Sequence, residues 1–167
     1  MTNPATTPEY APVRIPVALA LRTHALLQTF EGTEGLVYWA GVSEGRGGTI
    51  TTLVVPQTEA YYARIQTSPA ANAEVIDTLS RHRIVLLGQA HSHPPGAPAR
   101  HSEGDDVLTF SPFEGAISIV VPNFAQGDCD PRTWGVHRYT HGAYRFIPPS
   151  RRLEHLHVLP TEVDHRR

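Results

Sequence analysis

An apolar run at residues 84–88 leads almost directly into His91-Ser92-His93-Pro94, and this stretch constrains the chain more than any other. The run has the length and composition of a buried strand. Successive side chains of a strand point to opposite faces, so residues two apart share a face. We therefore expect His91 and His93 to direct their imidazoles to the same side, where two nitrogen ligands for a metal would converge.

A third metal ligand follows within the next loop. A catalytic zinc is held by three protein ligands and keeps one position open for water. Asp105, separated from His93 by eleven residues, is the natural oxygen donor to complete a His-His-Asp set. Asp106 is the alternative ligand. The loop between His93 and Asp105 contains Pro94, Pro95 and Pro98, which favour a defined conformation.

The pattern His-x-His, a loop, then Ser-x-x-Asp at residues 102–105 resembles the JAMM/MPN family of zinc metalloproteases. The family also has an upstream glutamate that opens a strand of the form Glu, six residues, Gly, and Glu34 to Gly41 fits that spacing whereas Glu31 does not. The loop before the aspartate is one residue longer here than the family's usual spacing. The resemblance implies one Zn²⁺ per chain, with these roles: His91, His93 and Asp105 as ligands, Ser102 supporting the tetrahedral intermediate, and Glu34 as the general base.

The order of elements predicts an α/β fold, and the resemblance implies a single-domain, curved mixed β-sheet packed with helices. We expect a flexible lead-in at residues 1–12, the metalloprotease domain at 13–149 and a tail at 150–167. Helices are predicted at 16–29, with an apolar face of Val17, Ala18, Leu21 and Ala25, and from Ser68-Pro69 to residues 81–83. Strands are predicted at 34–42, 49–55, 84–88, 116–121, 134–139 and 143–147, and a short helix from Ser102.

Composition excludes several classes of function. A formal charge of −2 gives no basic surface for nucleic acid, and no apolar run is long enough to span a membrane. The single cysteine, Cys129, cannot form an intramolecular disulfide, and together with the absence of a signal-peptide pattern this favours the cytoplasm. The fourteen basic residues are all arginine. This reflects either a GC-rich genome or escape from a machinery that modifies lysine amines.

The remaining candidate side chains have ordinary interpretations. We read His155 and His157, a second His-x-His, as solvated tail residues without a third ligand. A lone loop histidine such as His101 is more often exposed and idle than catalytic. Cys129 lacks a basic neighbour that would lower its pKa. Tyr61 and Tyr62 are candidates to line a groove for an extended substrate, although packing in the core or at its rim is the favoured role of each.

The family resemblance implies a peptidase or isopeptidase that cleaves after the C-terminal glycine of a ubiquitin-like protein, either in conjugates or in a precursor. Neighbouring conjugation enzymes are the other expected partners. Alternatives are a peptidase that processes a sulfur-carrier protein and a non-catalytic MPN-like scaffold that binds partner subunits. A zinc-dependent deaminase is disfavoured because its zinc is held by a histidine and two cysteines.

Overall fold

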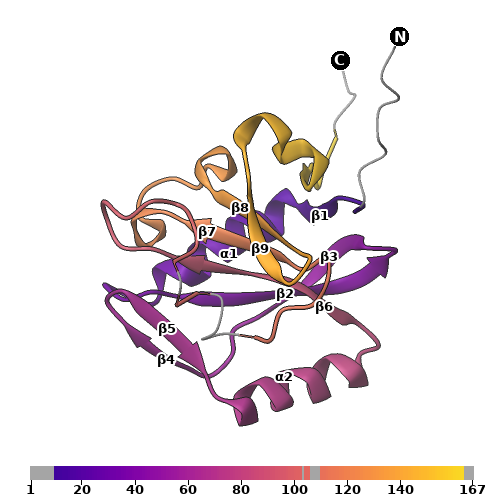
Figure 1. Ribbon diagram of the computed structural model, residues 1–167, viewed down its shortest axis with the longest axis horizontal. Coiled ribbons are helices and arrows are strands. Elements are labelled where there is room, and N and C mark those ends of the chain that lie inside the picture. Colours follow the sequence, from indigo (N-terminus) through magenta and orange to yellow (C-terminus); the bar gives the residue numbers. More distant parts are fainter. Residues whose placement is uncertain (1–9, 103, 106–109, 164–167) are drawn as a thin grey trace.

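The computed structural model describes residues 10–102, 104–105 and 110–163 (Figure 1). The helices and strands, in chain order, are β1 (Val13–Pro16), α1 (Val17–Gln28), β2 (Leu36–Glu44), β3 (Gly47–Val54), β4 (Thr58–Tyr61), β5 (Arg64–Thr67), α2 (Pro69–Arg81), β6 (Val85–Ser92), β7 (Ile117–Val121), η1 (Asn123–Ala125), η2 (Pro131–Thr133), β8 (Gly135–Thr140), β9 (Ala143–Ile147), η3 (Pro149–Glu154) and β10 (Leu156–Leu159).

Within these residues, eight strands form a mixed sheet in the order β10-β1-β3-β2-β6-β7-β8-β9, and β4 and β5 form a separate hairpin. Strand β6 pairs in parallel with β7 and antiparallel with β2. The predicted α/β class, a curved mixed sheet packed with helices, is confirmed. None of the described helices combines the length and the apolar character needed to cross a membrane.

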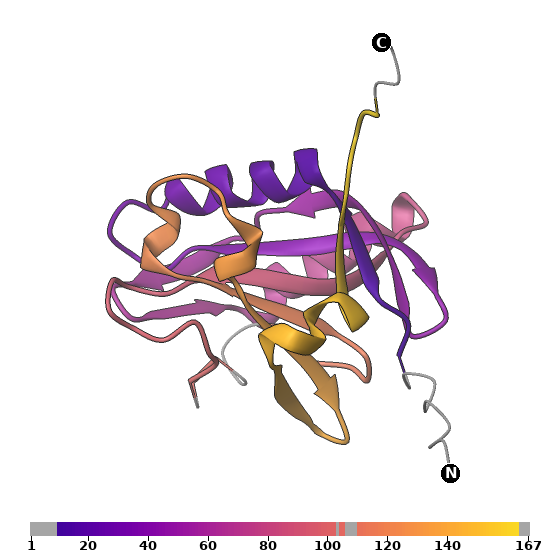
Figure 2. The same cartoon turned by 90° about the horizontal axis from the view of Figure 1, so that it is seen from above.

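The central strands are buried on both faces because the two helices cover opposite sides of the sheet. Along β2, Val37 and Trp39 belong to the core on the α1 side, whereas Leu36 and Tyr38 belong to the core beneath α2. Figure 2 shows α1 lying along one face of the sheet. The sequence of a strand buried on both faces is typically a continuous apolar run, and the first half of β2 has such a sequence.

Helix α1 forms where it was predicted, but the predicted apolar face was wrong. Its buried residues are Ala20, Thr23, His24 and Leu27, and Leu21 is 52% exposed. Apolar residues occur on several sides of this helix, so the pattern alone did not select a face. The buried Thr23 hydroxyl accepts a hydrogen bond from Trp39 Nε1 at 3.0 Å and donates one to the Leu19 carbonyl, which satisfies a polar group in the core.

Helix α2 begins as predicted, because the Ser68 hydroxyl caps it by accepting from the Ala71 N–H at 3.1 Å. The β2–β3 and β8–β9 hairpins are also confirmed. Four of the described strands were not predicted: β1, β4, β5 and β10. All are short, and four residues provide little periodicity.

The C-terminal segment departs from the expectation for residues 150–167. Strand β10 pairs in parallel with β1, so the sheet continues beyond Pro149. His155 is only 7% exposed, and the prediction that it is solvated was wrong. Most of the predicted lead-in lies outside the described residues, but Tyr10 is buried and its ring contacts the guanidinium of Arg138. Contacts between segments far apart in the chain, which no local pattern reveals, explain these findings.

Candidate metal centre

Two imidazoles converge at the C-terminal end of β6. His91 is 1% exposed and His93 is 5% exposed, and their Nε2 atoms are 3.2 Å apart. The main-chain N–H of His93 donates to the Val121 carbonyl at 2.9 Å, which holds the histidine beside the end of β7. The prediction that period-2 geometry brings both rings to one side is confirmed.

The Asp105 carboxylate completes the cluster. Its Oδ2 lies 3.1 Å from His93 Nε2 and 3.5 Å from His91 Nε2. Tetrahedral zinc with bonds of about 2.1 Å has ligand atoms separated by about 3.4 Å, and the three observed separations agree with this value. These residues therefore fit a zinc ion. The alternative ligand, Asp106, lies outside the described residues.

Hydrogen bonds set the charges of this cluster. Burial would raise the pKa of Asp105, but hydrogen bonds from His91 and His93 and from the Ser102 main-chain N–H hold that pKa far below its usual range. Burial opposes the charged form of His93, but its hydrogen bonds to Asp105 and to the Pro98 carbonyl raise its pKa. An ionised carboxylate thus faces two imidazole nitrogens, a donor set suited to a divalent cation.

Glu34 lies beside this cluster, just before β2. Its N–H donates to the Tyr61 carbonyl at 2.9 Å, and the next residue, Gly35, donates to the Ser92 hydroxyl between the two histidines. Glu34 is 3% exposed, and its Oε2 has no hydrogen-bond partner among the described residues. Burial raises its pKa to about 7, a shift reduced by the nearby His93 and increased by Asp105. The structure therefore brings Glu34 into the site that the sequence assigned to it.

Glu31 and Ser102, unlike Glu34, are both exposed. Glu31, the next candidate for the base, is exposed, which agrees with its misfit to the spacing. Ser102 is also exposed, and its main-chain N–H donates to Asp105 Oδ2 at 2.6 Å. Only part of the predicted helix from Ser102 is described. Residues 104 and 105 form a turn there, and the rest falls outside the described residues.

A left-handed turn follows β7 on another side of the site. Asn123, Phe124 and Ala125 have φ angles of 57°, 50° and 57°, a conformation that costs a residue other than glycine about 1–3 kcal/mol. The Phe124 N–H donates to the His93 carbonyl at 2.7 Å. The Phe124 ring packs edge-on against Tyr62, with centroids 5.4 Å apart. The Tyr62–Phe124 ring pair thus connects the β4–β5 hairpin to the backbone of His93.

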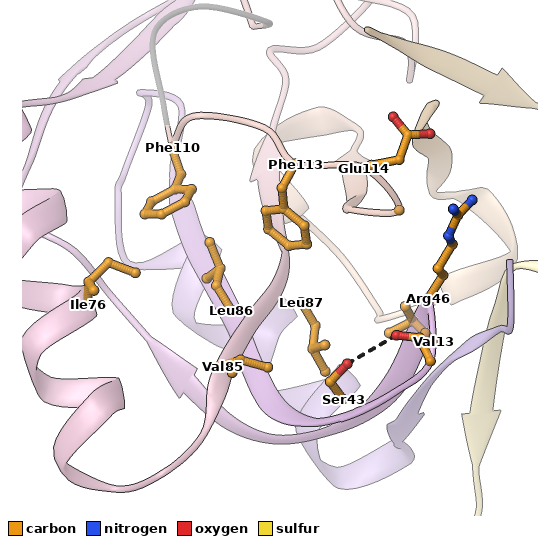
Figure 3. A pocket seen from close by; sticks show the side chains of 13 residues that line it. Val13, Ser43, Arg46, Ile76, Val85, Leu86, Leu87, Phe110, Phe113 and Glu114 are labelled. Atoms are coloured by element: carbon orange, nitrogen blue, oxygen red, sulfur yellow. Dashed lines mark hydrogen bonds between the residues drawn. The ribbon is translucent and has the colours of Figure 1, made fainter. Parts of the chain in front are cut away.

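The cavity shown in Figure 3 lies away from this cluster. It encloses about 400 Å³ and is lined mainly by apolar side chains such as Leu86, Leu87, Phe110 and Phe113. Arg46 and Glu114 are its charged lining residues, and none of the metal-cluster residues or Glu34 lines it. The cavity is therefore separate from the metal cluster.

Sequence reasoning missed a row of polar residues on the face of the sheet that carries His91. Ser118 and His137 are 0% and 2% exposed, and Gln89 is 3% exposed. The available indication was a single serine within the apolar run of β7. His101 was expected to be idle, but its Nε2 lies 2.7 Å from the Ser118 hydroxyl. Cys129 is half-buried, and burial raises the pKa of its thiol, consistent with the expected absence of nucleophilic chemistry.

Part of the chain is similar to a named metalloprotease. The chain is 33% identical over 108 residues to the probable metalloprotease y4jG of Sinorhizobium fredii (strain NBRC 101917 / NGR234), an alignment of 60% of this chain and 63% of that protein. The match therefore spans less than two thirds of the relative's length. No protein-family profile matches the sequence.

Solved structures share the fold at low sequence identity. A solution structure of a Desulfitobacterium hafniense protein has a TM-score of 0.63 and 13% identity, covering 92% of this chain and 95% of that one. A JAB1/MPN domain protein from Archaeoglobus fulgidus has a TM-score of 0.52 and 17% identity, with coverages of 89% and 98%. A structure described as JAMM, a metalloprotease-like zinc site in the proteasome and signalosome, has a TM-score of 0.50 and 17% identity, with coverages of 89% and 99%.

The structure contains both the fold and the residue cluster that the family resemblance implied. The chain has the JAB1/MPN fold, and it brings two histidines and an aspartate together at the end of β6. The predicted resemblance to the JAMM/MPN family is confirmed in both respects.

Proposed function

We propose that this protein is a zinc-dependent peptidase that cleaves after the C-terminal glycine of a ubiquitin-like protein, in a conjugate or in a precursor. The observation that carries the proposal is the convergence of His91, His93 and Asp105, whose ligand atoms lie within 4.8 Å of one another, beside the buried Glu34. The named metalloprotease relative supports the hydrolytic chemistry.

The two imidazoles and the carboxylate would hold the metal. When bound, zinc supplies a Lewis acid that lowers the pKa of water and polarises a peptide carbonyl. Glu34 is suited to proton transfer because a pKa of about 7 lets its carboxylate both accept and return a proton near neutral pH. It would take the proton from the attacking water and deliver it to the departing amine. The Ser102 hydroxyl would donate a hydrogen bond to the developing oxyanion.

The surroundings of Glu34 suit an extended peptide. Each strand of the β4–β5 hairpin pairs with one neighbour in the described structure, which leaves an edge for main-chain hydrogen bonds to a substrate. The hairpin is tied to the site, because the Tyr61 carbonyl accepts from the Glu34 N–H. The Tyr62–Phe124 ring pair lies next to the backbone of His93, and in this proposal it restricts the residue before the cleaved bond to glycine. These features support a preference for glycine before the cleaved bond.

The test uses the purified full chain, prepared without a metal-binding tag, and a peptide ending in Gly-Gly joined to an aminocoumarin reporter. We expect near-stoichiometric zinc and release of the fluorophore. His93→Ala should lose both, and a peptide ending in Ala-Ala should be cleaved far more slowly. Equal cleavage of the two peptides would refute the glycine preference. A wild-type chain that binds no zinc when it is supplied would refute the peptidase and favour a binding scaffold.

If the peptide is cleaved, a second experiment can distinguish between two classes of natural substrate. Candidate substrates are a ubiquitin-like protein fused through its C-terminal glycine to a reporter, and a sulfur-carrier protein with the same fusion. We expect the first to be cleaved. Cleavage of the sulfur-carrier fusion alone would replace the proposed substrate while retaining the zinc peptidase.

A further inference from the structure

A row of buried polar side chains crosses the sheet behind the metal cluster. The strand register places Gln89 of β6 beside Ser118 of β7, and Ser118 beside His137 of β8. Side chains at paired positions lie on the same face, and His91 is two residues from Gln89 on that face. Gln89 Nε2 donates to the Ser118 hydroxyl at 3.4 Å. The row therefore extends from a metal-ligand strand to the far strands of the sheet.

His101 attaches the ligand loop to this row. Its Nε2 lies 2.7 Å from the Ser118 hydroxyl, and its main-chain N–H donates to His137 Nε2 at 3.1 Å. Its ring packs against those of His137, Tyr144 and His91, with centroids 4.2, 4.6 and 5.4 Å apart. The His101 side chain thus contacts strands β7, β8 and β9 of the sheet and also a metal ligand, His91.

The residues before His101 are held to the same surface. The Arg100 guanidinium lies 4.2 Å from the centre of the Phe146 ring on β9. The Ala99 carbonyl approaches Gly135 so closely that a Cβ at that glycine would be 1.7 Å from its oxygen. The Pro98 carbonyl contacts His93 Nδ1 at 2.9 Å. Four consecutive loop residues are therefore fixed immediately before the segment that supplies Ser102 and Asp105.

We propose that His101 is a positioning residue: by joining the loop to Ser118 and His137 and packing on His91, it holds Asp105 in place to bind the metal. The inference rests on the proposed function, because it concerns the same metal site. Some residues orient a metal ligand without touching the metal. Removing such a residue typically weakens metal affinity by about 10–100-fold. A purely structural role would change stability and leave metal affinity intact.

The experiment measures the zinc Kd by competition with a chromophoric chelator, together with the melting temperature of the zinc-free protein, for the full chain and its variants. His101→Ala removes both the ring packing and the bond to Ser118, whereas His101→Phe keeps the ring and removes the bond. Ser118→Ala removes the partner hydroxyl. His82→Ala, an exposed histidine at the end of α2, is the matched control.

We expect His101→Ala to weaken zinc binding by roughly tenfold or more. His101→Phe should fall between it and the wild type, and His82→Ala should bind as the wild type does. When Ser118→Ala is combined with His101→Phe, the zinc Kd should change little further, because His101→Phe already removes the hydrogen bond between these two side chains. An unchanged zinc Kd in both His101 variants would overturn the inference, whatever their melting temperatures. A wild-type chain that binds no zinc would instead refute the proposed function, so the two failures are distinguishable.

Discussion

Glu34 illustrates how folding changes the chemistry of a common side chain. The carboxylate is 3% exposed, and burial raises its pKa to about 7. A group that titrates near the working pH can both accept and donate a proton, which an exposed carboxylate with an ordinary pKa does poorly. Its neighbour Glu31 is exposed and provides a matched comparison within the same segment.

Glu34→Gln should retain zinc and lose turnover by about 10²–10⁴-fold, because the amide cannot accept the proton. The measurements are zinc content and kcat on the Gly-Gly reporter peptide. Glu31→Gln should leave both unchanged. Substantial turnover in Glu34→Gln would remove Glu34 from the role of general base.

At the scale of elements, the site depends on how the ligand loop lies on β8 and β9. Gly135 begins β8, and its missing side chain allows the Ala99 carbonyl to approach the strand. Gly41 of β2 makes a comparably close approach, to the Thr49 carbonyl of β3, within the sheet itself. Substitutions at these two glycines can therefore distinguish the effect of moving the ligand loop from the effect of disturbing the sheet.

Gly135→Ala should displace the loop and weaken zinc binding, since the new Cβ would be 1.7 Å from the Ala99 oxygen. Gly41→Ala meets the Thr49 oxygen at 2.0 Å and should destabilise the fold, typically by about 1–3 kcal/mol, while the folded fraction keeps its zinc affinity. Urea unfolding and the zinc Kd distinguish the two effects. Equal zinc affinities in Gly135→Ala and the wild type would contradict this account of the loop.

For the whole molecule, the metal site links segments far apart in the chain. Glu34 precedes β2, the histidines end β6, and Asp105 comes from the following loop. The unfolded chain has no preformed site, so zinc binds the native state preferentially. Metal binding and global stability are therefore thermodynamically linked.

Zinc at about 1,000 times its Kd should stabilise the fold by about 4 kcal/mol and raise the melting temperature by about 10 °C in a domain of this size. Calorimetry with and without a chelator measures the shift. His93→Ala should show little shift. A wild-type melting temperature that is independent of zinc would contradict the predicted linkage.

His155 connects pH to the stability of the fold. Burial lowers its pKa, helped by the charges of Arg138 and Arg151, and neither ring nitrogen has a hydrogen-bond partner among the described residues. The unfolded chain, with an ordinary histidine pKa of about 6.5, therefore binds more protons than the native state below that pH. The contribution to stability is present above about pH 6.5 and is lost as the pH falls through and below it.

His155→Phe should remove this part of the acid sensitivity. We expect the free energy of unfolding of the variant, measured in urea without metal, to fall less than that of the wild type between about pH 7 and pH 5. The exposed His82→Phe should follow the wild type. Parallel pH profiles for His155→Phe and the wild type would exclude His155 as a source of the sensitivity.

Local patterns in the sequence determined much of the fold and the metal site. A buried strand ending in His-x-His, the Ser68 cap and the two predicted hairpins depend on neighbours within a few residues, so their periodicity and turn chemistry identify them. The roles of Glu34 and Ser102 came from a family resemblance, and their catalytic parts remain predictions.

Only the tertiary structure decided which faces and which distant partners are used. The buried face of α1, the pairing of β10 with β1 and the burial of His155 depend on packing between segments far apart in the chain. The raised pKa of Glu34 and the anchoring of His101 likewise require neighbours contributed by other strands and loops. Sequence periodicity records what each element can bury, whereas the pairing of elements decides what each side chain meets.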